Sequence, residues 1–311
     1  MVQVEKYIPA HKAAWDAFVH RSKNGTFLLQ RDYMEYHADR FTDHSLLFYR
    51  KGKLIALLPA NEAGKEIQSH GGLTYGGIIS DNRMKVSIML EVFEVMLQYF
   101  KQCGFDKINY KTVPHIYHQA PAEEDLYVLF RNKGRLYRRD VTSAIDMAQL
   151  FGYSRKRKWE VSKAKRNNIK VELSLDFAGF MRIEQELLKE RYDIPPVHTV
   201  EEITCLANLF PNQVKLCAAF EESLMLGGII IYETPAVAHC QYIAYTARGK
   251  ELGVLNVIID YLLTKVYQDK KYFDFGISTE QQGAYLNEGL ISNKESYGAR
   301  AVVHDFYEIV L

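Results

Sequence analysis

The same succession of elements occurs twice in this 311-residue chain, and that repetition constrains its fold more than any other feature. In the second half, apolar residues alternate with polar ones as in a half-buried strand, and then recur at helical spacing. Thr199 and Glu202 form a capping box that opens a further helix. The predicted elements of this half are strand 169–175, helices 180–188 and 199–209, strands 213–220, 224–233 and 238–246, helix 255–266, strand 272–277, helix 284–297 and strand 301–310.

The first half repeats this order. Its predicted elements are strand 3–8, helices 13–19 and 33–40, strands 45–49, 54–59 and 76–80, helix 89–100, strand 107–111, helix 125–132 and strand 135–144. The halves are most alike at CGFDKINY, from Cys103, and KKYFDFGI, from Lys270. This order predicts an α+β fold of two duplicated domains, residues 1–148 and 149–311, each with a mixed, mostly antiparallel sheet flanked by helices.

Charge is distributed unevenly along the chain. The formal net charge is +1, but residues 131–170 carry 13 Lys and Arg against three acidic residues, which leaves −9 for the remainder. The segment RKRKWEVSKAKRNNIK, from Arg155, holds eight of these basic residues and one acid. This asymmetry indicates an anionic partner at the junction, and a solvated helix face is the alternative. No recognition helix, zinc spacing or aromatic RNP motif accompanies the run, so a pyrophosphate or an RNA end fits better than duplex DNA.

The expected compartment follows from features that the sequence lacks. The four cysteines, Cys103, Cys205, Cys217 and Cys240, form no CxxC pair, which indicates buried free thiols in a reducing compartment. No apolar segment follows a basic start, and the longest apolar helix falls short of the ~20 residues that a bilayer needs. We therefore expect a cytoplasmic protein without a membrane span.

Three segments of the second half carry a resemblance to a known family. They are a basic helix, RKWEVSKAKRNNIKV from Arg157, a strand ending in Gly and Ser, FDFGIS from Phe273, and GAYLNEGLISNKESYGAR from Gly283. In this order they resemble the FemABX-like peptidyltransferases and their relatives, which are built from two acetyltransferase-like (GNAT) units. The resemblance implies tandem GNAT domains and transfer of an acyl or aminoacyl group onto an amine.

The resemblance also implies two catalytic residues. Acyl transfer to an amine needs alignment of the reactants, a deprotonated amine, a donor for the oxyanion and an acid for the leaving group. Tyr285 lies in a segment similar to the GNAT segment whose tyrosine protonates a departing thiolate. Lys294 takes a place near the reacting carbonyl, where a cation stabilises negative charge. An aromatic packed on the sheet and a solvated helix lysine are the alternatives.

The GNAT resemblance further implies where a donor binds. Acyl-CoA users hold the pyrophosphate on backbone N–H groups at the start of the long helix, through a [QR]-x-x-G-x-[GA] turn. The segment from Arg248 to Gly253 matches both ends of this turn but has Glu251 in place of the middle glycine, a carboxylate that repels pyrophosphate. The residues expected to bind the donor are Tyr245, Arg248, Gly249, Lys250, Gly253, Asn256 and Ser278.

The acceptor is expected at the basic junction and beside the short helices of the second half. The residues expected to bind it are Lys156, Arg157, Lys163, Arg166, Tyr192, His198, Tyr242 and Asp274. Asn293 stands where enzymes that use aminoacyl-tRNA tend to have an aromatic residue, so one stacking contact for a tRNA end is missing. His115 and His118 have no acidic companion nearby, and we expect no metal site.

Together these features predict a cytoplasmic acyltransferase. It would move an acetyl or other acyl group from acyl-CoA onto an amine of a small-molecule or cell-wall-precursor acceptor with an anionic group. Two alternatives stay open. One is a FemABX-type transferase that uses aminoacyl-tRNA and acts on a peptidoglycan precursor. The other is a non-catalytic binding protein that keeps the GNAT fold and has lost the donor, which Glu251 and Asn293 both favour.

Overall fold

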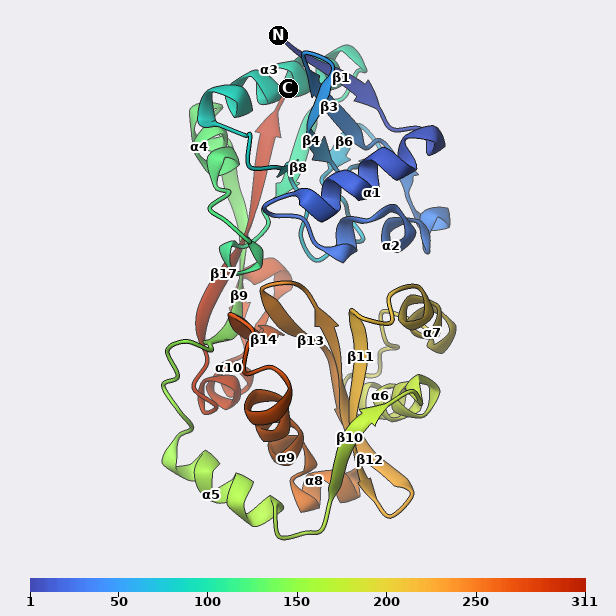
Figure 1. The fold of residues 1–311 in the computed structure, drawn as a ribbon, viewed down its shortest axis with the longest axis vertical. Helices are drawn as coiled ribbons and strands as arrows, with labels where there is room; N and C mark the ends of the chain where they lie inside the picture. The colour runs from blue at the N-terminus through green and yellow to red at the C-terminus, as the bar shows by residue number, and fades with distance from the viewer. The chain divides into compact units, whose positions relative to one another are not determined.

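The computed structural model describes residues 1–311, with the exception of the side chain of Tyr192. The chain forms two compact units that interleave along the sequence (Figure 1). Unit 1 comprises Met1–Val141, Thr279–Tyr285 and Val302–Leu311, and unit 2 comprises Thr142–Ser278 and Leu286–Ala301. The chain passes between the units inside strands β9 (Arg135–Asp146) and β17 (Arg300–Val310). The boundary predicted after residue 148 separates two duplicated halves of the sequence, which is a different division from that into compact units. It stays a prediction.

Helices and strands alternate through both units. The α-helices are Lys12–Arg21 (α1), Arg31–Glu35 (α2), Val86–Gln102 (α3), Glu124–Arg131 (α4), Arg155–Ala164 (α5), Phe177–Tyr192 (α6), Val200–Leu209 (α7), Ala247–Leu252 (α8), Val254–Tyr261 (α9) and Glu288–Glu295 (α10). The other strands are Val2–Lys6 (β1), Thr42–Asp43 (β2), Leu46–Arg50 (β3), Lys53–Leu58 (β4), Asn61–Ala63 (β5), Glu66–Gln68 (β6), Ile79–Ser80 (β7), Lys107–Lys111 (β8), Lys170–Ser174 (β10), Val214–Glu221 (β11), Leu224–Glu233 (β12), Val237–Tyr245 (β13), Tyr272–Ile277 (β14), Thr279–Glu280 (β15) and Tyr285–Leu286 (β16).

Unit 1 is built around the apolar stripe of α3. The buried residues of this stripe recur at helical spacing and are Met89, Val92, Phe93, Met96 and Phe100. They pack with apolar side chains of β1, β3, β4, β6, β8 and β17 in one core. The predicted helix is confirmed, whereas β2, β5 and β6 were not predicted, because two or three residues are too few to show a period.

Unit 2 contains a sheet in the order β10-β11-β12-β13-β14, with α8 and α9 on one face and α6 and α7 on the other (Figure 1). Strands β10 to β13 are antiparallel, and β13 and β14 run parallel. Apolar side chains of α9, among them Val254 and Ile258, form the core with residues of β11 to β14. The predicted order of elements in this half is confirmed.

Three expectations about local structure are wrong. Residues 247–252, expected to be a turn, form α8, because the side chain of Thr246 caps a helix there. The last helix begins at Glu288 rather than at residue 284, since Tyr285 and Leu286 pair with β15 as β16. Cys217 and Cys240 are buried free thiols, but Cys103 and Cys205 are exposed. Cys103 follows the last turn of α3 and Cys205 lies on the solvent side of α7.

Candidate active site

The sheet of unit 2 opens where β13 and β14 diverge. The parallel ladder between them covers three positions, Val237↔Tyr272, Ala238↔Phe273 and His239↔Asp274. Immediately after Asp274, β14 is also irregular against β9. The opening therefore lies towards the C-terminal ends of two parallel strands, which is the edge where such sheets commonly bind ligands.

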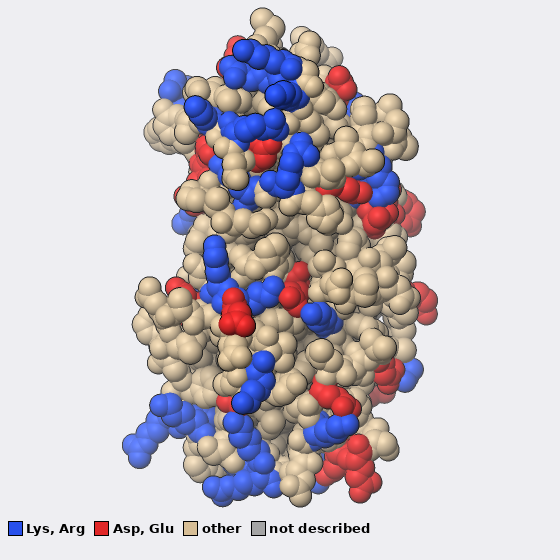
Figure 2. Space-filling model, in the orientation of Figure 1, with Lys and Arg blue, Asp and Glu red and all other residues tan. Residues whose placement is uncertain are grey.

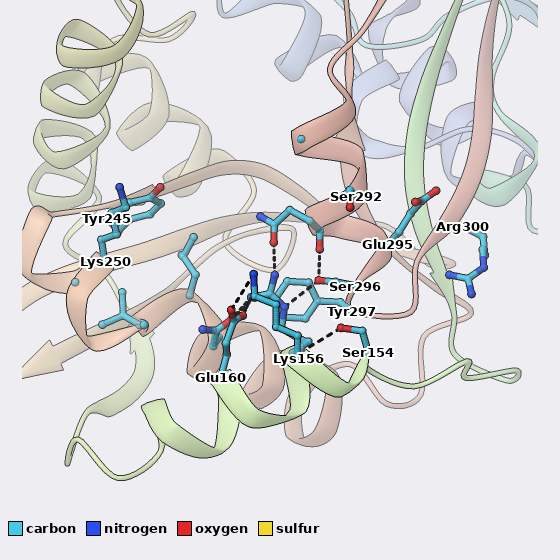
Figure 3. A pocket seen from close by; sticks show the side chains of 18 residues that line it. Ser154, Lys156, Glu160, Tyr245, Lys250, Ser292, Glu295, Ser296, Tyr297 and Arg300 are labelled. Atoms are coloured by element: carbon cyan, nitrogen blue, oxygen red, sulfur yellow. Dashed lines mark hydrogen bonds and ion pairs between the residues drawn. The ribbon is translucent and has the colours of Figure 1, made fainter.

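A cavity of about 1010 Å³ lies within unit 2 at the end of β13. Its walls come from α5, α8, the start of α9 and the region of α10. Figure 3 shows Tyr245 and Lys250 at one end of the cavity, and Glu295 and Arg300 at the other. The predicted site residues that line it are Lys156, Arg157, Tyr245, Gly249, Lys250, Gly253 and Asn256. Residues predicted to bind the donor and two residues of the basic helix thus share one cavity.

Arg157 joins the walls of this cavity. Its guanidinium Nε donates to Ser296 Oγ at 2.9 Å and its Nη1 pairs with Glu160 at 2.8 Å. The same group donates to the side-chain oxygens of Asn256 and Asn293 and lies 4.0 Å from the ring centroid of Tyr297 (Figure 3). Because its donors are taken by protein acceptors, Arg157 shapes the cavity rather than offering it a free charge.

Three other cations reach the cavity. Lys156 has 86% of its side chain exposed and lies 3.9 Å from Glu160, so its charge is little compensated. Lys250 comes from α8, and Arg300 comes from the start of β17 with its guanidinium over the ring of Phe151. The walls also hold two carboxylates, Glu160, which is engaged by Arg157, and Glu295. Four cations thus face two carboxylates, and the walls favour an anionic ligand.

The backbone N–H groups of the predicted pyrophosphate turn are used inside α8. Thr246 Oγ1 accepts from the N–H of Gly249 at 3.0 Å, and the Thr246 carbonyl accepts from the N–H of Lys250 at 2.9 Å. At the other end of α8, the N–H of Gly253 donates to the Lys250 carbonyl at 3.1 Å. A pyrophosphate cradle needs N–H groups without such partners. The N–H groups of Gly249, Lys250 and Gly253 are therefore not available to the pyrophosphate of acyl-CoA.

The packing and backbone conformation of α8 explain why glycine occupies positions 249 and 253, without reference to a ligand. A Cβ at Gly249 would lie 2.2 Å from the Leu226 carbonyl oxygen, so glycine allows α8 to pack directly on β12. Gly253 has a φ of +71° and forms the left-handed C-cap of α8, a conformation that glycine adopts without steric cost.

Arg248 and Glu251 lie on the outer side of α8 and do not contribute to the cavity walls. The Arg248 guanidinium pairs with Glu221 at 3.0 Å and with Glu251 at 3.5 Å, and it lowers the pKa of Glu221. The side chain of Glu251 is 70% exposed. The bonded N–H groups of Gly249, Lys250 and Gly253, rather than the carboxylate of Glu251, are what oppose binding of a pyrophosphate here.

Lys294 and Ser278, two of the predicted site residues, form a hydrogen bond with each other. Lys294 is buried, and its Nζ donates to the carbonyls of Gly276 and Ile277, each at 2.8 Å, and to Ser278 Oγ at 2.9 Å. Burial lowers the pKa of Lys294 to about 8, against the attraction of Asp274. An ammonium has three donors, so all are used in holding the end of β14 and none is left for an oxyanion.

Asp274 holds a histidine that sequence reasoning missed. The carboxylate is fully buried, and its Oδ2 accepts from His239 Nδ1 at 2.7 Å. Its Oδ1 accepts from Thr142 Oγ1 and from the N–H of Gly276. The contact with Asp274 orients the ring of His239, and an oriented imidazole is a group that can serve as a general base. His239 does not line the cavity of unit 2. Only the register of β13 against β14 pairs these two residues, and the sequence does not reveal that register.

The remaining residues predicted to bind the acceptor do not line the cavity. His198 Nδ1 and the Tyr242 hydroxyl form a buried hydrogen bond. Lys163 is exposed on α5, and Arg166 is exposed in the turn that follows it. The side chain of Tyr192 lies outside the described residues.

Tyr285, the predicted acid, lies on the short strand β16 with its side chain half exposed. It belongs to unit 1, whereas the cavity lies within unit 2. Its assignment as the acid therefore stays a prediction.

The part of the chain that the structure describes holds neither a metal-binding cluster nor a helix that could span a membrane. No three or more His, Cys, Asp and Glu side chains of this set are grouped to hold a metal ion. None of the described helices combines the length and the apolar character needed to cross a bilayer.

Solved structures with the same fold cover nearly the whole chain. FemX matches with a TM-score of 0.69 at 12% identity, covering 99% of this chain and 97% of FemX. L-PGS from Bacillus licheniformis matches with a TM-score of 0.64 at 12% identity, covering 97% of this chain and 91% of L-PGS. A tandem GNAT protein from the clavulanic acid biosynthesis pathway matches with a TM-score of 0.54 at 8% identity, covering 100% of this chain and 98% of that protein. No protein-family model and no curated protein matches the sequence.

These likenesses define the class of the fold. The protein has the tandem FemABX/GNAT acyltransferase fold, an α+β architecture, as the sequence predicted. At 12% identity or less, the likeness shows the fold alone and specifies no substrate.

Proposed function

We propose that this protein is an aminoacyltransferase that takes its aminoacyl group from an ester at the 3′ end of an RNA and passes it to an amine. The observation that carries the proposal is that the N–H groups of Gly249, Lys250 and Gly253, in the predicted pyrophosphate turn, are bonded within α8. An RNA end needs no such cradle, because its phosphates are spread along the chain and are bound by side chains. The FemX-like fold over the whole chain supports the same choice.

The cavity in unit 2 offers the groups that an RNA end would contact. Lys156, Lys250 and Arg300 attract phosphates, and the ring of Tyr245 is a surface on which a base can stack. Tyr245 is held in place by Arg191, whose guanidinium bonds its hydroxyl and lies 5.3 Å from its ring centroid. Tyr245 would thus supply the aromatic contact that is missing at Asn293.

The reaction would move the aminoacyl carbon from a ribose oxygen to the amine nitrogen. The amine attacks the ester carbonyl, the C–N bond forms, the C–O bond breaks, and one proton passes from the amine to the ribose oxygen. We assign His239 to accept and return that proton, because Asp274 orients its ring at the point where β13 and β14 diverge. His239 is not part of the cavity walls, so the amine would reach it through this opening of the sheet. Lys294 would position this pair by holding the end of β14.

The acceptor that we propose is an amine on a cell-wall precursor or another small molecule with an anionic group. Lys156 has 86% of its side chain exposed at the cavity and is little compensated, so it would attract such a group. The cytoplasm, expected from the sequence, is the compartment in which aminoacyl-RNA and such precursors meet.

Two calorimetric titrations distinguish the donors. We expect an acceptor-stem RNA with an amide-linked aminoacyl group at its 3′ end to bind with micromolar affinity, and coenzyme A and acetyl-CoA not to bind. Micromolar binding of acetyl-CoA would overturn the proposal and restore an acyl-CoA donor. Binding of neither ligand would favour the non-catalytic binding protein.

Variants of the cavity lysines show whether the RNA end occupies the cavity. The double variant K156A/K250A should weaken binding of the amide-linked RNA at least about tenfold, because two phosphate contacts are lost. Lys101 and Lys265, both exposed and absent from the cavity walls, supply the matched control K101A/K265A. Equal losses in both variants would place the RNA elsewhere.

Transfer of a radiolabelled aminoacyl group tests the assigned base. H239N should lower the rate by about 10² to 10⁴-fold, which is the usual contribution of a general base. A rate within threefold of the wild type, in a variant that folds normally, would exclude His239 from proton transfer.

A further inference from the structure

The outer face of α5 carries positive charge with no acidic partner among the described side chains. Five exposed residues define this face: Arg155, Lys158, Trp159 and Lys163 on the helix, and Arg166 in the turn that follows it. The other cations of the segment differ, since Arg157 pairs with Glu160 and Lys165 pairs with Asp260 at 2.5 Å. Figure 2 shows the corresponding group of blue side chains at the lower left, over α5.

The inner face of α5 holds these cations on a fixed surface. Ser154 caps the helix by accepting from the N–H of Arg157. Val161 and Ala164 are buried, and the Arg157 guanidinium ties the helix to α9 and to the region of α10. The outer side chains are therefore carried by a helix that is packed on unit 2, rather than by an unfolded tail.

Large apolar side chains are exposed together with this charge. Trp159, in the middle of the outer face, is 64% exposed, and Lys163 Nζ lies 5.4 Å from its ring centroid. In the segment before α5, Leu150 and Phe151 are 63% and 65% exposed. Apolar surface of this kind is unfavourable in water and becomes favourable when it enters an apolar phase. Trp with Lys and Arg is also the set of residues that proteins place at the level of lipid headgroups.

We propose that the outer face of α5 docks on an anionic lipid surface. Its cations would contact the phosphates of the headgroups, and Trp159 would enter between them. A phosphodiester backbone would attract the same cations, but an exposed Trp at the centre of a cationic helix face is the arrangement that proteins place at lipid headgroups. Lys156 of the same helix lines the cavity, so docking would bring the cavity to the membrane surface. The proposal does not depend on the identity of the donor.

Vesicle binding by the full chain tests this docking. Vesicles of phosphatidylcholine and phosphatidylglycerol in equal amounts are compared with vesicles of phosphatidylcholine alone. Of the two tryptophans, Trp15 is fully buried, so a change in tryptophan emission reports on Trp159. We expect co-sedimentation and a blue shift with the anionic vesicles only, both weakening as salt rises.

Charge-reversal variants locate the contact. K163E/R166E should weaken binding at least about 25-fold, because each cation near an anionic surface contributes about fivefold. K101E/K265E changes the net charge equally at two exposed lysines outside this face and should bind like the wild type. Equal losses in both pairs would mean that net charge alone drives binding, and would overturn the proposal.

Two further results bear on the lipid assignment. W159A should weaken vesicle binding about tenfold while keeping its salt dependence, and unchanged binding would overturn the insertion of Trp159. If K163E/R166E weakened binding of an RNA duplex but left vesicle binding unchanged, the outer face of α5 would be an RNA surface and the lipid proposal would be overturned. Circular dichroism of each variant confirms that a loss of binding is not a loss of fold.

Discussion

Unit 1 and unit 2 each use one lysine as a clamp on backbone oxygens. In unit 1, Lys111 Nζ donates to the carbonyls of His70, Gly71 and Leu73, at 3.0, 3.2 and 2.6 Å. In unit 2, Lys294 Nζ donates to two carbonyls and to Ser278 Oγ. Burial lowers the pKa of both lysines to about 8. The same bonding of an ammonium thus occurs once in each unit.

The two clamps differ in what they hold. Lys111 fastens a glycine-rich loop of unit 1, whereas Lys294 fastens the end of β14, next to the strand position where Asp274 bonds His239. The family resemblance singled out Lys294 and not Lys111, although their donors are used alike. The comparison teaches that a resemblance can identify an important position while the contacts decide whether that position reacts with substrate or supports a residue that does.

Removing either ammonium should produce the largest effect. K294M and K111M should each lower the free energy of unfolding by about 3 kcal/mol, because three oxygens lose their donor at once. Urea denaturation measures this, with K265M as a control that should stay within about 0.5 kcal/mol. If the clamps differ as described, only K294M should also slow aminoacyl transfer. Equal loss of transfer in K111M, measured on the folded fraction, would break the comparison.

A second pair of variants compares the glycines beside the clamps. Gly77 has a φ of +76°, and a Cβ there would lie 2.7 Å from the Lys111 carbonyl oxygen. Gly276 has a φ of +78°, but a Cβ there would make an ordinary contact, 3.5 Å from His239 Cε1. G276A should cost about 1 kcal/mol for the left-handed backbone alone, and G77A should cost about 3 kcal/mol because a clash is added. Thermal unfolding that ranks them in the reverse order would contradict this account.

The pH dependence of the free energy of unfolding tests whether burial lowers the pKa of Lys111 and Lys294. The ordinary pKa of a lysine is 10.5, so between pH 8 and 10 the unfolded chain keeps a proton that the folded protein has lost. The free energy of unfolding therefore rises with pH in this window. The difference between wild type and K294M should grow by about 1 kcal/mol from pH 8 to pH 9. A constant difference in urea denaturation would mean that Lys294 keeps its ordinary pKa.

The smallest effect is expected at Tyr285. Its side chain is half exposed and does not line the cavity, so Y285F should change the transfer rate by less than about twofold. A tenfold fall with unchanged stability would restore the role of acid that the resemblance implies, and it would show that a residue of unit 1 serves the site.

Local patterns in the sequence predicted many elements closely. The strand expected at residues 272–277 is β14, and the capping box of Thr199 and Glu202 is present at the start of α7. Both depend on neighbours within a few residues, where side-chain spacing and caps dominate. The helical form of α8 was missed, because a motif from the resemblance suggested a turn and the cap at Thr246 was overlooked.

The candidate site was predictable only in part. Tyr245, Lys250 and Lys156 were named from the sequence, and the structure places them around one cavity. His239 was missed because its partner Asp274 is 35 residues away, and their contact depends on the register of two strands joined by a helix. Nothing in the order of residues fixes that register by itself.

The sequence by itself determined the order of elements, the FemABX/GNAT type of fold and the concentration of positive charge at residues 155–166. Only the tertiary structure decided what each charge does: it turned Arg157 inward to five partners and left Arg155 and Lys163 on the outer face of the same helix. The physical reason is that propensity, spacing and caps act between near neighbours. The partners of a buried polar group, in contrast, come from distant segments whose positions are set when the core packs.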